Sequence, residues 1–140
     1  MPLERLYQEE ILELARVARQ ISPLTDATVN YTVRNPICGD EVTIYLSINS
    51  QGLVKKYGHK VRGCALCEAS AGLVSKKVIG LKKNILLNIN QNAKDWLNGI
   101  NNDFIFNEIK TFTPVKEYKN RHKCILLSFN ALSGAFETNS

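Results

Sequence analysis

The sequence predicts an α+β fold in which a three-stranded antiparallel sheet packs against four to five helices. Three observations predict it: an amphipathic helical pattern at the start, a strict period of two in the next third, and helical spacing with many small residues in the second half. The chain has 140 residues, of which 44% are hydrophobic, so it is long enough for one core. We therefore expect residues 1–140 to form a single domain.

Residues 3–21 are expected to form the first helix. Their apolar side chains recur at intervals of three and four, which places them on one helical face: Leu3, Tyr7, Ile11, Leu14, Ala18 and Ile21. Ser22-Pro23 then ends the helix, because proline cannot continue it.

Residues 42–48 give the clearest strand. Apolar positions alternate with polar ones, as expected when one face of a sheet is buried: Val42, Ile44, Leu46 and Ile48. Gln51-Gly52 supplies a turn, and residues 54–61 are expected to return antiparallel to residues 42–48. Residues 28–33 are a plausible strand ahead of both, which gives a three-stranded meander.

The second half is expected to be helical. A helix rich in small residues follows Cys64, with Gly80 fitting its C-cap. Asn84 is expected to cap a further helix that Asn98-Gly99 closes, with one apolar side made by Ile85, Ile89, Ala93 and Trp96. Residues 121–136 are expected to form a last amphipathic helix, with one shared face: Cys124, Ser128, Ala131, Leu132 and Ala135.

Three cysteines are predicted to lie at the ends of these elements. Cys38 falls in the loop after the first strand, Cys64 at the junction of the third strand and a helix, and Cys124 in the first turn of the last helix. Helix N-termini favour the thiolate form of cysteine, because unpaired backbone N–H groups and the helix dipole stabilise negative charge. Two of the three thiols are thus poised to act as ligands or nucleophiles.

The residues beside these cysteines point to a metal site. Asp40 lies two positions after Cys38, so three thiolates and one carboxylate are available. Thiolates select zinc, copper(I) or iron–sulfur centres, and a fourth oxygen ligand is compatible with tetrahedral geometry. Gly39 and Gly63 adjoin two of the cysteines and allow the close backbone approach that a metal loop often needs.

Burial without function is the alternative for any single cysteine, because unpaired cysteines are among the most buried residues. We expect this for Cys67, which lies three residues after Cys64 inside the small-residue helix. A redox pair of Cys64 and Cys67 is conceivable from the C-x-x-C spacing. However, the flanking residues of the thioredoxin motif are missing, so the spacing is a weak signal.

Charge and hydropathy limit the expected location and partners. The first residues lack the basic and apolar segments of a secretory signal, and no stretch reaches the roughly 20 apolar residues that cross a bilayer. We therefore expect a cytoplasmic protein, where reduced cysteines favour metal or thiol chemistry over structural disulfides. The net charge of +5 is spread over small groups without interleaved aromatic residues, so neither a nucleic-acid nor a membrane partner is expected.

Three motifs surround the cysteines in a fixed order: Asn35-Pro36-Ile37-Cys38-Gly39-Asp40, Gly63-Cys64-Ala65-Leu66-Cys67-Glu68-Ala69-Ser70 and Lys123-Cys124. Together they resemble the U-type iron–sulfur cluster assembly family, which comprises NifU N-terminal domains, IscU and SufU. The resemblance covers residues 6–136 and favours the SufU-like branch. Lys123 stands where IscU-type members carry a histidine, and Arg121 matches the SufU arginine three residues before the third cysteine. His122 is one position away from the IscU histidine and does not inherit its role.

The resemblance implies a metal site at one exposed end of the fold, formed by Cys38, Asp40, Cys64 and Cys124. It implies zinc there, and a zinc-dependent sulfurtransferase activity in which Cys38 accepts persulfide sulfur from a cysteine desulfurase and Arg121 stabilises the thiolate or persulfide. One alternative is a non-enzymatic scaffold on which Cys38, Cys64 and Cys124 hold a transient [2Fe-2S] cluster, which is then passed to downstream assembly proteins or apo-proteins. The other is a structural zinc domain, which the Asp40 ligand disfavours.

Overall fold

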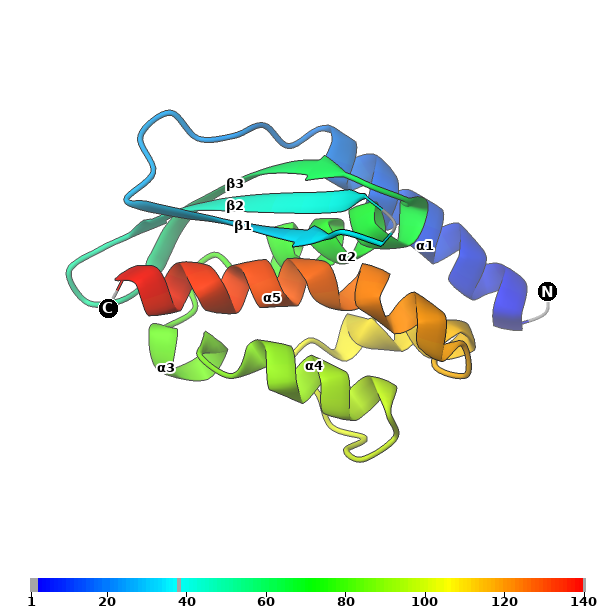
Figure 1. Cartoon of the computed structure of the whole chain (residues 1–140). Coiled ribbons are helices and arrows are strands. Elements are labelled where there is room, and N and C mark those ends of the chain that lie inside the picture. The colour runs from blue at the N-terminus through cyan, green and yellow to red at the C-terminus, as the bar shows by residue number, and fades with distance from the viewer. Residues whose placement is uncertain (1–2, 38, 140) are drawn as a thin grey trace.

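The structure is a computed structural model that describes residues 3–37 and 39–139. Its strands form one antiparallel sheet in the order β1-β2-β3, with helices on it (Figure 1). The elements follow in chain order: α1 (Leu3–Arg19), β1 (Val29–Asn35), β2 (Asp40–Ile48), β3 (Val54–Arg62), α2 (Ala65–Lys77), α3 (Lys83–Leu86), α4 (Ile89–Leu97), the 3₁₀ helices η1 (Asn107–Val115) and η2 (Lys119–Arg121), and α5 (His122–Asn139). The predicted α+β class and three-stranded sheet are confirmed.

The central strand β2 carries the apolar face of the sheet. Val42, Ile44 and Leu46 alternate along it and are fully buried, as the period of two predicts. The register pairs Ile44 with Tyr31 of β1 and with His59 of β3, so these side chains share the same face. The helices pack against this face of the sheet.

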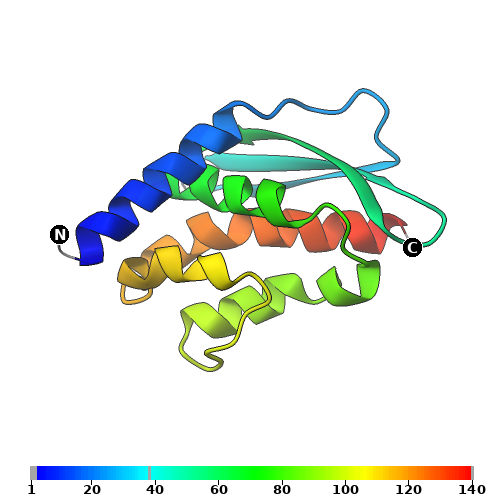
Figure 2. The same cartoon turned by 180° about the vertical axis from the view of Figure 1, so that it is seen from behind.

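Two helices cover this face. Helix α5 lies against β1 and β2, α2 lies against β3, and the two helices also contact each other. Helix α4 packs on α5 away from the sheet, and α1 crosses α2, as the view from behind shows (Figure 2). The sheet, the α2–α5 layer and α4 therefore form successive layers.

Helix α1 approaches α2 very closely at Gly72. A Cβ atom at this position would collide with the backbone carbonyl of Leu14. Leu14, Ala15 and Ala18 are buried along the same side of α1. Because the obstacle is backbone, which cannot rotate away, this interface requires glycine.

His59 of β3 connects the sheet to the end of α1. Its Nε2 lies 2.8 Å from the carbonyl oxygen of Ala18 and its Nδ1 lies 2.6 Å from the hydroxyl of Tyr57. Because a carbonyl only accepts, Nε2–H donates to Ala18 and Nδ1 accepts from the Tyr57 hydroxyl. Burial lowers the pKa of His59, which favours this neutral, doubly bonded form.

Several boundaries differ from the sequence prediction. The single helix expected from Asn84 is wrong: a turn at residues 87–88 divides it into α3 and α4, which brings both Leu86 and Ile89 into the core. The C-cap of α2 is Val78, and Gly80 follows it in a turn with φ of +86°. The helices η1 and η2 were not predicted.

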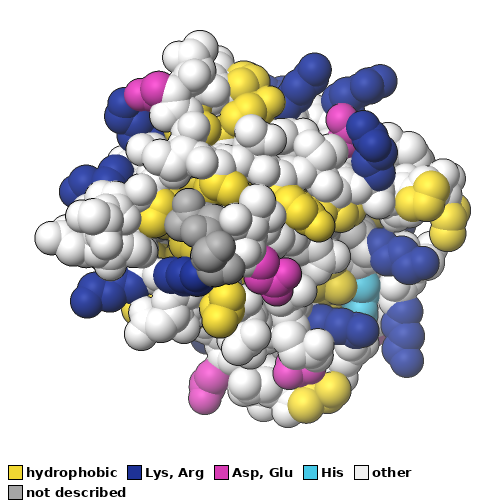
Figure 3. All heavy atoms as spheres, turned by 60° about the vertical axis from the view of Figure 1, so that its left-hand side comes forward, with side chains coloured by type: hydrophobic (Ala, Val, Ile, Leu, Met, Phe, Trp, Pro, Cys, Tyr) yellow, Lys and Arg dark blue, Asp and Glu magenta, His cyan; other side chains and the backbone are white. Residues whose placement is uncertain are grey.

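Lysine and arginine side chains are spread around the rim of the face seen in Figure 3, some of them beside acidic side chains, so no single basic patch dominates it. Within residues 3–37 and 39–139, no helix combines the length and the apolar character needed to cross a membrane.

Candidate metal centre

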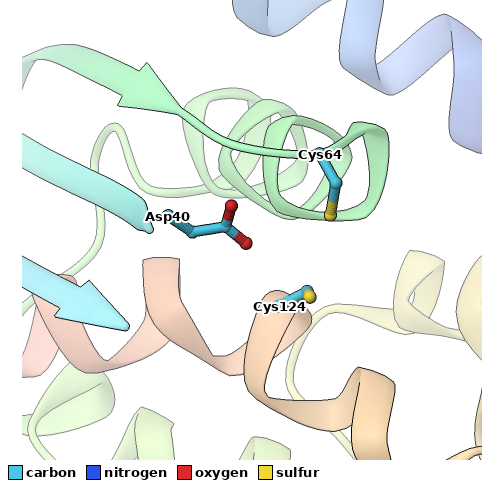
Figure 4. Close-up of side chains that lie close together, drawn as sticks. All are labelled: Asp40, Cys64 and Cys124. Atoms are coloured by element: carbon cyan, nitrogen blue, oxygen red, sulfur yellow. The ribbon is translucent and has the colours of Figure 1, made fainter. Parts of the chain in front are cut away.

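Three potential ligands from distant parts of the chain meet at one end of the sheet. Asp40 is the first residue of β2, Cys64 is the N-cap of α2, and Cys124 lies in the first turn of α5. One carboxylate oxygen and the two Sγ atoms all lie within 4.8 Å of one another (Figure 4). Cys38, the fourth predicted ligand, lies outside the described residues.

Asp40 is positioned by the β1–β2 connection. Gly39 adopts a φ of +76°, a conformation that L side chains rarely take, and its N–H donates to the carbonyl of Asn35 at 2.8 Å. The strands then pair from Asn35 and Asp40 onward. Because side chains alternate along a strand, Asp40 shares the inward face with Val42. A carboxylate is thus placed at the edge of the apolar core.

Cys64 is positioned where β3 gives way to α2. Its backbone is extended, and its carbonyl accepts the first helical hydrogen bond from the Glu68 N–H at 3.0 Å. Its side chain does not cap the helix, and the sulfur points toward the space between Asp40 and Cys124 (Figure 4). The thiol is therefore presented to the other two ligands.

Gly63 makes room for the Asp40 carboxylate. A Cβ atom on Gly63 would lie 2.9 Å from both Cγ and Oδ1 of Asp40 and 3.1 Å from Cβ of Cys67. Real Cβ atoms are almost never closer than 3.0 Å to another heavy atom. The glycine in the Gly-Cys motif is therefore required for space, since its φ is not positive.

Cys124 comes from the buried side of α5 and is 8% exposed. The hydroxyl of Ser70 on α2 donates to the carbonyl of the next residue, Ile125, at 2.6 Å. This buried bond joins the two helices that carry Cys64 and Cys124 and so fixes their spacing. Sequence analysis did not single out Ser70, although a polar residue within an otherwise small and apolar helical run was the available signal.

One oxygen of Asp40 has no partner among the residues that the structure describes. The residue is 6% exposed, yet Oδ2 is fully buried and makes no hydrogen bond to residues 3–37 or 39–139. A buried carboxylate oxygen left in this state costs free energy unless a cation or a donor satisfies it. Two sulfurs and an oxygen at this spacing are donors that zinc accepts, so the residues present fit such a metal.

Arg121 and His122, which precede Cys124, differ in their exposure and contacts. Arg121, at the end of η2, is exposed and lines a pocket of about 310 Å³ together with Cys124, Asn35 and Ile37. His122 is buried, and its Nε2 lies 2.8 Å from the carbonyl of Lys116. That hydrogen bond joins the ring, at the start of α5, to the segment before this helix.

Cys67 is fully buried in α2, one turn after Cys64. The prediction that it lies in the interior is confirmed. Its side chain is part of the hydrophobic core.

Comparison with known proteins identifies the family. Residues 6–125 match the profile of the NifU-like N terminal domain. This chain belongs to that family. It is 30% identical over 138 residues to the protein named iron-sulfur cluster assembly scaffold protein IscU from Thermotoga maritima, an alignment that covers 98% of this chain and 96% of the relative.

Solved structures of NifU-like proteins have the same fold. An N-terminal NifU-like protein from Brucella abortus superposes with a TM-score of 0.84 at 31% identity, covering 95% of this chain and 93% of that one. FiSufU from Fervidobacterium islandicum, the proposed iron-sulfur cluster assembly scaffold of the SUF system, superposes with a TM-score of 0.83 at 27% identity, covering 96% and 99%. The predicted U-type family, with SufU-like proteins among its structural neighbours, is confirmed.

Proposed function

We propose that this protein works in iron–sulfur cluster assembly by accepting sulfur from a cysteine desulfurase at a zinc site made by Cys38, Asp40, Cys64 and Cys124. The supporting observations are that Asp40, Cys64 and Cys124 bring their ligand atoms within 4.8 Å of one another, and that Oδ2 of Asp40 is buried without a partner in the described part of the chain. Membership of the NifU family supports the wider role in cluster assembly.

Zinc at this site would supply positive charge that keeps the cysteine ligands deprotonated. Asp40, Cys64 and Cys124 would hold it from three elements of the folded core. In the proposed reaction the Cys38 thiolate attacks the outer sulfur of the desulfurase persulfide. A new S–S bond forms on Cys38, the old S–S bond breaks, and the desulfurase cysteine leaves as a thiolate.

Arg121 is proposed to stabilise the sulfur anions of this exchange. It lines the same pocket as Cys124 and carries a fixed positive charge. After transfer, the sulfur would pass to downstream assembly proteins or apo-proteins in a reducing cytoplasm. Each of these partners is part of the proposal.

The test measures alanine production by a cysteine desulfurase in the presence of the zinc-loaded protein without iron. Stimulation that Cys38→Ala abolishes, with persulfide found on the wild-type chain, supports sulfur acceptance. Cys67→Ala is the matched control, because it removes a thiol outside the proposed ligand set and should leave the stimulation unchanged. Equal stimulation by Cys38→Ala would contradict the role given to Cys38.

A second function is favoured by the names of relatives, which are cluster assembly scaffolds. Three thiolates and an oxygen can hold a [2Fe-2S] cluster less tightly than four thiolates, as suits a cluster that is passed on. In the same assay a scaffold would not stimulate alanine production without iron. Iron–sulfide absorbance that appears only after ferrous iron is added would overturn the sulfur-acceptor proposal in favour of this one.

A further inference from the structure

The first turn of α2 carries two thiols in different surroundings. Cys64 is half-buried at the N-cap, whereas Cys67 is fully buried. The hydrogen bond from the Glu68 N–H to the Cys64 carbonyl closes this turn as an α-helical one. Residues three apart in a regular helical turn have Cβ atoms about 5–6 Å apart, which is wider than the roughly 3.5–4.5 Å of a disulfide. Cys64 is the N-cap, however, and its backbone is extended rather than helical, so closing the disulfide requires a movement of this residue and not of the helix.

Cys67 also lies near the candidate metal centre. The position that a Gly63 Cβ would occupy is 3.1 Å from Cβ of Cys67 and 2.9 Å from Oδ1 of Asp40. Both side chains are therefore close to Gly63, the residue directly before Cys64.

We propose that Cys64 and Cys67 form a redox-active dithiol whose oxidation removes Cys64 from the metal centre. The accessible Cys64 thiolate attacks a small disulfide oxidant, RSSR, giving a Cys64–S–S–R mixed disulfide and one RS⁻. The Cys67 thiolate then attacks Cys64 Sγ from within the turn, forms the Cys64–Cys67 disulfide and expels the second RS⁻. Two electrons pass to the oxidant, and the two thiol protons leave with the two RSH products.

Burial suits Cys67 to the second step only. A fully buried thiol cannot meet an external oxidant, but it can reach a mixed disulfide on its neighbour in the same turn. Cys124 is the competing partner, because its sulfur is within 4.8 Å of Cys64 Sγ. It belongs to another helix, however, and the Ser70–Ile125 hydrogen bond fixes the spacing of α2 and α5, whereas Cys67 lies in the same turn as Cys64.

Metal binding and disulfide formation compete for the same sulfur. A Cys64 thiolate bound to zinc cannot at the same time be joined to Cys67. Oxidation should therefore be fast in the metal-free protein and slow in the zinc-loaded protein, and it should release zinc when it occurs.

The test treats metal-free and zinc-loaded protein with oxidised glutathione, alkylates the remaining thiols after denaturation and analyses tryptic peptides by mass spectrometry. Cys64 and Cys67 fall in one peptide, residues 63–76, while Cys38 and Cys124 fall in others. The expected product is this peptide without alkylation and two hydrogens lighter, abundant in the metal-free sample and at least about tenfold scarcer with zinc. The mass shift is independent of desulfurase activity, so its failure is distinct from failure of the proposed function.

Several results would overturn the proposal. These are full alkylation of both cysteines after oxidation, a cross-link of Cys64 to the peptide that begins at Cys124, or equal oxidation with and without zinc. Cys67→Ser is the control: it should lose the internal disulfide and keep wild-type zinc stoichiometry. Loss of zinc from Cys67→Ser, with Cys67→Ala showing the same loss and native circular dichroism, would instead make Cys67 a ligand and refute the assignment.

Discussion

The contact of α1 with the rest of the fold and the candidate metal centre are built from the same two parts. Each has a glycine that allows a close approach, Gly72 in the first region and Gly63 in the second. Each also has a buried polar side chain on the inward face of the sheet, His59 in the first and Asp40 in the second. The two regions differ in how those polar atoms are satisfied.

Both ring nitrogens of His59 have partners at 2.6 and 2.8 Å, whereas Oδ2 of Asp40 has none within residues 3–37 and 39–139. A satisfied buried group holds elements together, while an unsatisfied one costs free energy in the absence of a ligand. The difference indicates that the α1 contact serves stability and that the Asp40 end keeps its binding capacity for a cation. Four substitutions test this division, from the largest expected effect to the smallest.

Gly72→Ala should give the largest loss of stability. Alanine has the higher helix propensity, but its Cβ would collide with the backbone of Leu14. We expect the free energy of unfolding to fall by about 3 kcal/mol, the upper end for overpacking, with zinc affinity of the folded protein unchanged. Urea denaturation of the metal-free protein measures this. The exposed Lys76→Ala on the same helix should stay within about 0.5 kcal/mol of wild type. An equally stable Gly72→Ala would show that the helices can separate at little cost.

Asp40→Asn should lower the affinity for zinc without lowering the stability of the metal-free fold. Zinc at 100 times its dissociation constant should stabilise the wild type by about 2.7 kcal/mol, and a tenfold weaker site would lose roughly half of this. The metal-free variant should unfold at a temperature no lower than that of the metal-free wild type, because the substitution removes the buried carboxylate charge of Asp40. Thermal unfolding with zinc and with EDTA checks both points. Glu41→Gln is the control, since Glu41 pairs with Arg34 outside the centre. A large loss of metal-free stability in Asp40→Asn would contradict this account.

Gly63→Ala should weaken zinc binding more than folding. The added Cβ meets the Asp40 side chain, which can turn aside, and Cβ of Cys67 at 3.1 Å, so the fold should lose about 1 kcal/mol, the lower end for overpacking. The displaced carboxylate should lower zinc affinity by at least about tenfold, the smaller effect seen when even outer-shell groups are removed. Competition with a chelating dye measures the affinity. Gly52→Ala, where φ is +80° and the surrounding space is open, should strain the backbone yet bind zinc normally. Normal zinc affinity in Gly63→Ala would remove the reason given for this glycine.

His59→Gln should flatten the pH dependence of stability. Burial lowers the pKa of His59 below its ordinary value of 6.5, so the unfolded chain binds more protons as the pH falls below this value. Wild-type stability should therefore be fully present above pH 6.5 and fall below it, by at most about 1.4 kcal/mol per pH unit. The variant should be flatter between pH 6.5 and 5, as measured by urea denaturation of metal-free protein. Paired carboxylates such as Glu13 and Glu41 titrate below this window. Identical slopes would mean that His59 does not titrate there.

The sheet and three of the helices could be predicted because their patterns are strong and local. The alternation along β2 leaves one side of the strand for the core, and the spacing of α1 gives one apolar face. The turn between α3 and α4 could not be predicted, because Leu86 and Ile89 fit one helical face in sequence and the turn residues 87–88 include neither glycine nor proline. The 3₁₀ helix η1 contains Pro114 and has no α-helical pattern to detect.

The residues of the candidate site could be predicted from the order of the motifs, whereas their burial and hydrogen bonding could not. The motifs indicated that Asp40, Cys64 and Cys124 belong together, and the structure brings them within 4.8 Å. The unpartnered oxygen of Asp40 depends on packing across three elements, which sequence does not contain. Likewise Gly63 was predicted to allow close approach, but the group it admits became visible only in three dimensions.

The three candidate ligands belong to β2, the start of α2 and α5, so the ribosome synthesises them at different times. Asp40 and Cys64 leave the ribosome well before Cys124, and α3, α4 and the 3₁₀ segments must emerge between them. Until α5 docks, a nascent chain can present only part of the ligand set, so tight loading with metal must wait for the last helix. The ion would then be acquired by a finished fold, and premature capture of metal by the growing chain would be weak and reversible.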